Sequence, residues 1–233
     1  MRAAVVIPVY NHGQRIAAVV KEARELELPI FVVDDGSTDD TAAQLATLPG
    51  ITVLGHEVNQ GKGAALLTGF TAAAATYDWA LTIDADGQHR PADGRALLAL
   101  ARQGSRSLVL GNRQGMEQEH VPWTSRFGRG FSNFWVWVAG GPRVMDSQSG
   151  FRLYPLPEVL DLQVQARRYQ FEVEVLVRAR QHGIEILEVP IQVVYQPRGE
   201  RISHFRPWLD FMRNTNTFAR LICARLFGWK PGK

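Results

Sequence analysis

Short apolar runs alternate with longer helical patterns along the first half of the chain, and this alternation limits the fold more than any other feature. The runs are rich in Val, Ile and Leu, and they predict buried strands at 3–9, 30–33, 51–54, 79–83 and 108–110. Helical patterns lie between them at 14–26, 38–48 and 62–77, and Pro91 is placed to open a further helix. Strands that are hydrophobic throughout and separated by helices form a parallel sheet covered on both faces. We therefore expect an α/β fold with a mostly parallel central sheet and helices on both faces.

The alternation fades after about residue 115. Helical patterns are expected at 127–138, 166–182 and 203–226, and a strand-like segment at 184–194 is interrupted by Pro190. A chain of 233 residues suits one α/β domain with a tail. No repeat or clear linker divides it, so we expect a single domain over 1–195 and a C-terminal extension over 196–233.

The predicted extension is basic and amphipathic. Residues 195–233 hold eight Lys or Arg and two acidic residues, so this segment carries six positive charges although the whole chain carries only three. Apolar or small side chains recur there at helical spacing: Trp208, Phe211, Met212, Thr215, Phe218, Ala219, Ile222 and Leu226. Such a helix can lie in a membrane interface without spanning it, next to anionic lipid. An amphipathic helix packed on the domain or on another subunit is the alternative, and a homo-oligomer stays compatible with the sequence.

The remaining composition points to an intracellular setting. The single cysteine, Cys223, excludes an internal disulfide and fits a reducing compartment. We expect no secretory signal, because Met1-Arg2 leads directly into an apolar run too short to be one. No apolar run approaches the roughly 20 residues that a spanning helix needs. We therefore expect a peripheral protein at the cytoplasmic face of a membrane, and no nucleic-acid partner, although the basic tail leaves nucleic acid as an outside alternative.

Polar motifs follow four of the predicted strands, where ligands of open α/β sheets bind. The clearest is Asp84-Ala85-Asp86-Gly87-Gln88 after the fourth strand. Residues two apart in an extended segment point the same way, so Asp84, Asp86 and the Gln88 amide can converge on Mg²⁺ or Mn²⁺. Asp-Gly is also common turn chemistry, so an ordinary acidic turn is the alternative.

Further candidates follow the first three strands. Tyr10 can flank a base, and Asp34 or Asp35 can accept a hydrogen bond from a base or a ribose. Lys62, in a glycine-containing segment that opens a helix, can meet a phosphate. A plain turn with Ser37 or Thr38 as the helix cap is the alternative for the second of these segments.

Four motifs occur together in a fixed order: Pro8-x-Tyr10-Asn11, Asp34-Asp35-Gly36-Ser37, Asn59-x-Gly61-Lys62-Gly63 and Asp84-x-Asp86-Gly87-Gln88. This set resembles the inverting family-2 glycosyltransferases of GT-A fold. Later segments resemble the dolichol- or polyprenyl-phosphate mannosyl- and glucosyltransferase branch: Asp146 to Arg152, Phe171 to Glu174, and Glu188 to Ile191. The resemblance covers about residues 3–195.

The resemblance implies a hexosyltransferase that uses a nucleotide-diphosphate sugar, Mg²⁺ or Mn²⁺, and a lipid-phosphate acceptor. It implies donor nucleotide binding by Pro8, Tyr10, Asn11, Asp34, Asp35, Lys62 and Asp84. It implies metal binding by Asp84, Asp86 and Gln88. Catalytic roles fall on Asp86, Arg113, Arg126 and Glu172, and acceptor phosphate contacts on Arg126, Arg129 and Arg152. His12 stands where the family usually has an acidic residue, so the choice between GDP and UDP stays open.

Two acceptor chemistries are compatible with these residues. A phosphate monoester is already an anionic nucleophile and needs cationic positioning more than a base. A hydroxyl of a lipid or glycan needs a general base, for which Glu172 is the first candidate and Asp146 the second. Glu174 is expected to face water. A non-catalytic sugar-nucleotide-binding protein is the alternative of another class.

Overall fold

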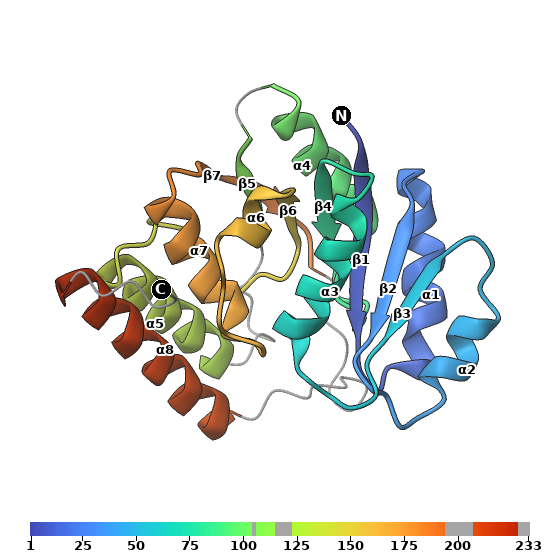
Figure 1. Ribbon diagram of the computed structural model, residues 1–233, viewed down its shortest axis with the longest axis horizontal. Helices are drawn as coiled ribbons and strands as arrows, with labels where there is room; N and C mark the ends of the chain where they lie inside the picture. Colours follow the sequence, from blue (N-terminus) through green and yellow to red (C-terminus); the bar gives the residue numbers. More distant parts are fainter. Residues whose placement is uncertain (104–105, 115–122, 194–206, 228–233) are drawn as a thin grey trace.

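The central sheet agrees with the predicted α/β architecture. The computed structural model describes residues 1–103, 106–114, 123–193 and 207–227, without the side chains of 123–127 and 207–211. Within these ranges, seven strands form one sheet in the order β3-β2-β1-β4-β6-β5-β7 (Figure 1). Their bounds are β1 (Ala3–Val9), β2 (Ile30–Asp34), β3 (Thr52–Gly55), β4 (Trp79–Thr82), β5 (Leu108–Arg113), β6 (Arg152–Pro155) and β7 (Ile186–Ile191).

Strand directions bring most strand ends to one edge of the sheet. β1 pairs in parallel with β2 and β4, β2 with β3, and β5 with β7. β6 runs antiparallel between β4 and β5. The carboxyl ends of the other six strands therefore share an edge with the amino end of β6. The mostly parallel sheet predicted from the sequence is confirmed.

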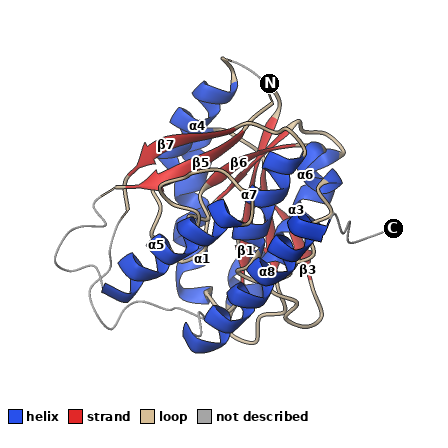
Figure 2. Ribbon diagram, turned by 90° about the vertical axis from the view of Figure 1, so that its left-hand side faces the viewer, coloured by secondary structure: helices blue, strands red, loops and turns tan. Residues whose placement is uncertain are grey.

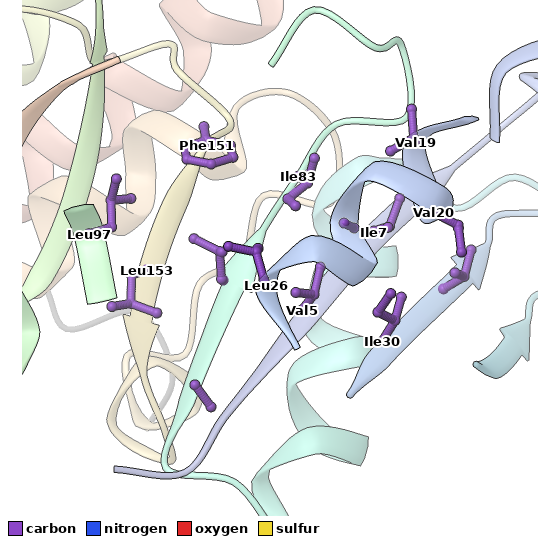
Figure 3. Close-up of a cluster of buried hydrophobic side chains, with 14 of the residues drawn as sticks. Val5, Ile7, Val19, Val20, Leu26, Ile30, Ile83, Leu97, Phe151 and Leu153 are labelled. Carbon is purple, nitrogen blue, oxygen red and sulfur yellow. The ribbon is translucent and has the colours of Figure 1, made fainter. Parts of the chain in front are cut away.

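Helices cover both faces of the sheet (Figure 2). One face carries α1 (Gly13–Ala23), η1 (Arg24–Leu26), α2 (Thr41–Ala46), η2 (Pro91–Asp93) and α4 (Gly94–Ala101). The other carries α3 (Lys62–Ala74), α5 (Trp123–Val138), α6 (Glu158–Asp161), α7 (Phe171–Gln181) and α8 (Pro207–Phe227). Each face of the sheet has its own hydrophobic core. Because side chains alternate along a strand, β1 contributes to both cores: Val5 and Ile7 lie in the first (Figure 3), and Ala4 and Val6 lie in the second.

The predicted element boundaries hold best in the first half of the chain. The five predicted strands are present, and Pro91 does open a helical turn. The predicted cap at Ser37 or Thr38 is wrong, because α2 begins later, with Asp40 at the cap position. β6 was not predicted. Pro190 lies inside β7, which the sheet tolerates because β7 is an edge strand.

The C-terminal helix α8 packs on the domain through one face. Phe218 and Leu221 are buried in the second core, and the Phe218 ring stacks on Trp135 of α5 at 6.5 Å between ring centroids. Met212 and Leu226 are exposed, whereas the side chains of Trp208 and Phe211 lie outside the described set. Among the described helices, none is long and apolar enough to cross a membrane. The inner face of α8 therefore packs on the domain, as in the alternative to a helix that lies in a membrane interface.

We predict that Gly69→Ala destabilises the protein by about 1–3 kcal/mol, because α3 lies too close to β1 for a side chain there. A Cβ on Gly69 would lie 2.5 Å from Val6 Cγ1 and 3.2 Å from Val33 Cγ2, both in the core. Urea unfolding measures the change. Gly55→Ala is the matched control, since a Cβ on Gly55 meets nothing within 4 Å. Equal stability of the two variants would contradict this account of the packing.

Candidate active site

The predicted site residues gather at the edge where the parallel strands end. Tyr10 and Asn11 follow β1, Asp34 ends β2, Asp84 lies two residues beyond β4, and Arg113 ends β5. The antiparallel β6 adds the segment just before it, including Gly150. Ligands of open α/β sheets bind at this kind of edge.

Lys62 joins two carboxylates at the centre of this edge. Its Nζ lies 2.6 Å from Asp84 Oδ1 and 2.5 Å from Glu172 Oε1. Lys62 is the first residue of α3, Glu172 lies in the first turn of α7, and Asp84 follows β4. The three charged groups therefore come from three elements, and the ammonium holds these elements together.

Gly150 lets the main chain approach this ion pair closely. A Cβ on Gly150 would lie 2.4 Å from Asp84 Oδ2 and 2.6 Å from Lys62 Nζ. Gly61, which precedes α3, has a φ of 104°, a conformation that favours glycine. Both glycines thus serve the same purpose, the placement of Lys62 against Asp84.

The electrostatics of the cluster favour charged forms of both partners. Burial alone would lower the pKa of Lys62, but Asp84 and Glu172 outweigh it and hold that pKa well above its usual range. Burial alone would raise the pKa of Asp84, yet the charge of Lys62 keeps it well below its usual range. Two carboxylates, Asp84 and Glu172, thus contact one ammonium, and His89 Nε2 lies 3.7 Å from the other oxygen of Asp84.

The Asp84-x-Asp86 segment supplies oxygen ligands of the kind that a hard divalent cation takes. Asp86 Oδ1 accepts a hydrogen bond of 3.0 Å from the main-chain N–H of Gln88, which shapes the turn. No group of three or more His, Cys, Asp or Glu suited to a metal occurs among the described residues. Mg²⁺ commonly uses only one or two carboxylates together with substrate phosphates. The donor set of Asp84, Asp86 and Gln88 therefore fits such an ion, with Lys62 as a competitor for Asp84.

The loops after β1 and β2 hold each other in place. Asn11 Oδ1 accepts from the Thr38 N–H at 2.7 Å, and the Asn11 N–H donates to Ser37 Oγ at 2.9 Å. Asp34 Oδ1 accepts from the Ser37 N–H at 2.9 Å. Tyr10 is partly exposed at this edge, whereas Pro8 is buried inside β1. Tyr10 and Asp34 thus stand beside the open edge, and Asn11 mainly positions the neighbouring loop.

Asp35 is buried and turned towards the protein. Its carboxylate accepts from the N–H groups of Gln60 at 2.9 Å and Gly61 at 2.7 Å, and it contacts His56 Nδ1 at 2.7 Å. The other ring nitrogen of His56 contacts Thr68 Oγ1 at 2.9 Å. Asp35 therefore anchors the segment that leads into Lys62. His56, which carried no signal in the sequence analysis, completes this anchor.

A second ion pair lies at the end of β5. Arg113 donates to Asp146 through Nε at 2.6 Å and Nη2 at 2.9 Å, and Asp146 is fully buried. Burial would raise the pKa of Asp146, but the charge of Arg113, supported by Arg129, brings it below its usual value. Arg129 is therefore near this pair, whereas the side chain of Arg126 lies outside the described set.

Arg152 is placed differently from the acceptor contact that the resemblance implied. Its side chain is fully buried, and its guanidinium donates to the main-chain carbonyls of Ser149 at 2.7 Å, Ser147 at 2.8 Å and Glu172 at 2.8 Å. These bonds hold the segment before β6 against the start of α7. Arg152 thus positions Gly150 and Glu172 from beneath the edge.

The expectation that Glu174 faces water is wrong. Glu174 is 0% exposed, and it pairs with Arg178 at 2.7 Å and Arg220 at 2.5 Å. Residues two apart on a helix point in roughly opposite directions, about 200° apart. Glu172 therefore faces the sheet edge, and Glu174 faces α8.

A comparison with known protein families decides the class of protein. The profile described as Glycosyl transferase family 2 matches residues 4–155, about two thirds of the chain. The chain belongs to glycosyl transferase family 2. The match contains Lys62, Asp84, Asp86 and Arg113, and this glycosyltransferase assignment confirms the resemblance drawn from the four ordered motifs.

Two relatives of this family-2 chain have names that include a lipid phosphate. A UDP-N-acetylglucosamine–dolichyl-phosphate N-acetylglucosaminyltransferase of Methanococcus voltae is 32% identical over 212 residues, covering 82% of this chain and 84% of that protein. An undecaprenyl-phosphate mannosyltransferase of Micrococcus luteus is 30% identical over 218 residues, covering 86% of each. The enzyme class predicted from the sequence is therefore confirmed, while these relatives differ in the sugar that their names give.

A solved structure supports the GT-A fold. TarS of S. aureus, residues 1–349 in complex with UDP, superposes with a TM-score of 0.61 at 17% identity, covering 96% of this chain. This chain spans 66% of that TarS chain. At this identity the likeness concerns the fold, which agrees with the sheet order and the helices on both faces.

We predict that Arg152→Met destabilises this glycosyltransferase by about 3 kcal/mol or more, because three buried carbonyls lose their donor. Urea unfolding measures the loss. Arg102→Met is the matched control: Arg102 is exposed at the end of α4, and its replacement should change stability by less than about 0.5 kcal/mol. An Arg152→Met protein with normal stability that fails only in acceptor binding would restore the acceptor role.

Proposed function

We propose that this chain transfers a hexose from a nucleotide-diphosphate sugar to a polyprenyl or dolichyl-like phosphate, with inversion at the anomeric carbon and with Mg²⁺ or Mn²⁺ as cofactor. The observation that carries this proposal is the convergence of Asp84, Lys62 and Glu172 at the edge where the strands end. Relatives with dolichyl- and undecaprenyl-phosphate in their names support the acceptor class.

The donor half of the site would use the residues after β1, β2 and β4. Tyr10 and Asp34, beside the open edge, would contact the nucleoside, and Asp84, Asp86 and Gln88 would hold the cation. A bound cation would neutralise the charge that grows on the departing nucleotide diphosphate. Lys62 lies beside Asp84 and would meet the same diphosphate. The nucleotide of the donor, GDP or UDP, stays open, because His12 stands where the family usually has an acidic residue.

The acceptor half would use the cations near the end of β5. An acceptor phosphate is already an anionic nucleophile, so one of its oxygens can attack the anomeric carbon while the bond to the diphosphate breaks. Arg113 and Arg129 lie together around Asp146 and would position such a phosphate, with Arg126 proposed from the resemblance alone. No proton has to be removed in this step.

Transfer to a hydroxyl is the second candidate, and it rests on Glu172. This carboxylate is only 6% exposed and contacts Lys62 at the sheet edge, where a base would be needed. Asp146 is less suited, because Arg113 holds both of its oxygens.

We also propose that the protein associates peripherally with a membrane. Exposed apolar side chains occur on α8 (Met212, Leu226, Phe227) and on α5 (Phe134, Trp137). These two helices lie side by side (Figure 1), which would bring the site to a lipid-linked acceptor. That the membrane face is the cytoplasmic one rests on the sequence alone.

We predict that Asp86→Ala lowers metal-dependent turnover by at least about a hundredfold, because a lost cation ligand removes stabilisation of the leaving group. The assay follows nucleotide release from UDP- and GDP-sugars with Mg²⁺ or Mn²⁺, with and without polyprenyl phosphate. Asp161→Ala, which changes an exposed aspartate at the end of α6, should leave turnover unchanged. Full turnover by folded Asp86→Ala would remove Asp86 from the site.

We predict that Glu172→Gln retains turnover with polyprenyl phosphate to within about tenfold, since loss of a general base costs about 10²–10⁴-fold. The same assay, with donor binding measured by calorimetry, tests this. Abolished turnover with intact donor binding would instead favour a hydroxyl acceptor.

A further inference from the structure

The segment 145–147 carries the buried partner of Arg113. Asp146, its middle residue, is fully buried, and Arg113 donates to both of its carboxylate oxygens, at 2.6 Å and 2.9 Å. The main-chain N–H of Arg113 also lies 3.4 Å from Asp146 Oδ2. The direction of the Arg113 guanidinium therefore follows the position of the Asp146 carboxylate, which in turn follows the main chain of this segment.

Glu188 holds this segment from the sheet. Its Oε1 accepts a hydrogen bond of 2.9 Å from the main-chain N–H of Met145. Glu188 lies in β7 opposite Leu110 of β5, the strand that ends at Arg113. Because alternate side chains of a strand share a face, Glu188 points to the same face as Ile186, which packs on the second core. Helix α5 covers that face, so β7 presents Glu188 to the segment that follows α5.

Asn133 of α5 holds the same segment from the helix layer. Its Nδ2 donates to the Met145 carbonyl at 2.8 Å, and its Oδ1 accepts from the Ser147 N–H at 2.9 Å. These two bonds fix the main chain directly before and directly after Asp146. Asn133 lies one helical turn after Arg129, the second cation near Asp146. One helix thus carries both a proposed contact of the acceptor phosphate and a side chain that holds the segment.

The place of Glu188 is unfavourable for its own charge. Burial raises the pKa of Glu188, the main-chain N–H groups of Met145 and Asp146 lower it, and the charge of Asp146 raises it further, so that it lies above its usual value. Carboxylates in such surroundings are more common at functional sites than elsewhere in a fold. Glu188 also begins the Glu188-Val189-Pro190-Ile191 motif, to which the proposed function gives no role.

We propose that Glu188 and Asn133 are positioning residues for the acceptor phosphate, because they fix the main chain around Asp146 and thereby the orientation of Arg113. This inference rests on the proposed function, in which Arg113 contacts that phosphate. A guanidinium binds phosphate through N–H groups of fixed direction, so a turned Asp146 carboxylate would misplace the phosphate relative to the anomeric carbon. A misplacement of about 1 Å can cost about 10²-fold in rate.

The test compares acceptor use and donor binding in variants of the full chain. Turnover is followed with the UDP- or GDP-sugar that the wild type uses and with farnesyl phosphate, a polyprenyl phosphate short enough to stay in solution. Glu188→Met removes the acceptor of the Met145 N–H at similar size, and it should raise the KM for farnesyl phosphate at least about tenfold. The affinity for UDP or GDP, measured by calorimetry, should keep its wild-type value. Asn133→Leu, which removes both bonds from α5, should give the same split.

Three further variants separate positioning from a general effect on the fold. Glu188→Gln keeps an oxygen that accepts from the Met145 N–H, so its KM for farnesyl phosphate should stay within about threefold of the wild type. Glu22→Met, which changes an exposed glutamate of α1 on the other face of the sheet, should leave both readouts unchanged. In an Arg113→Lys background, Glu188→Met should raise the KM by less than about twofold, because the residue through which Glu188 acts is already replaced.

Three results would overturn the proposal. One is a wild-type KM for farnesyl phosphate in folded Glu188→Met and Asn133→Leu. Another is an equal loss of donor and acceptor affinity, which a general change of the fold would cause. The third is a full additional effect of Glu188→Met in the Arg113→Lys background. All three leave the proposed function in place, whereas a wild type that transfers no sugar to any polyprenyl phosphate would remove the proposed acceptor and this inference together.

Discussion

The Lys62 ammonium, held between Asp84 and Glu172, is the interaction on which the candidate site depends. It joins the segment after β4 to the starts of α3 and α7. Lys62 and Glu172 are 110 residues apart along the chain. Opposite charges raise the pKa of the lysine and lower that of Asp84, so both stay charged despite their burial. A donor diphosphate or a cation entering this edge must therefore compete with an ion pair that already exists.

The surrounding structure serves to keep that ion pair in place. Asp35 and His56 fix the segment that leads into Lys62, and Arg152 fixes the segments that carry Gly150 and Glu172. Gly150 allows its own main chain to lie against the charged groups. Several buried polar residues near the sheet edge thus act on the same three side chains, which explains why they are fully hydrogen-bonded rather than directed outwards.

The parts of this arrangement that could be predicted depend on local sequence. Hydrophobic runs such as Ala3–Val9 indicate buried strands. Residues that follow such a run lie at the end of the strand, so the position of Asp84 was predictable. β6 was not, because four residues that include a buried arginine carry no strand pattern, and their place between β4 and β5 is set by tertiary pairing. The partners of Arg152, Asp35 and Glu174 were hidden for the same reason, since burial of a charged residue depends on distant groups.

Helix α7 then connects two groups of ion pairs in the molecule. Its first turn carries Glu172 towards the sheet edge and Glu174 towards α8, because a separation of two residues turns a helix by about 200°. Each carboxylate pairs with a cation of another helix: Lys62 of α3 on one side and Arg220 of α8 on the other. Since both carboxylates project from one short, rigid turn, any shift of this turn changes the surroundings of Lys62 and of Arg220 together. The start of α7 is therefore the structural link between the proposed donor site and the contact of α7 with α8.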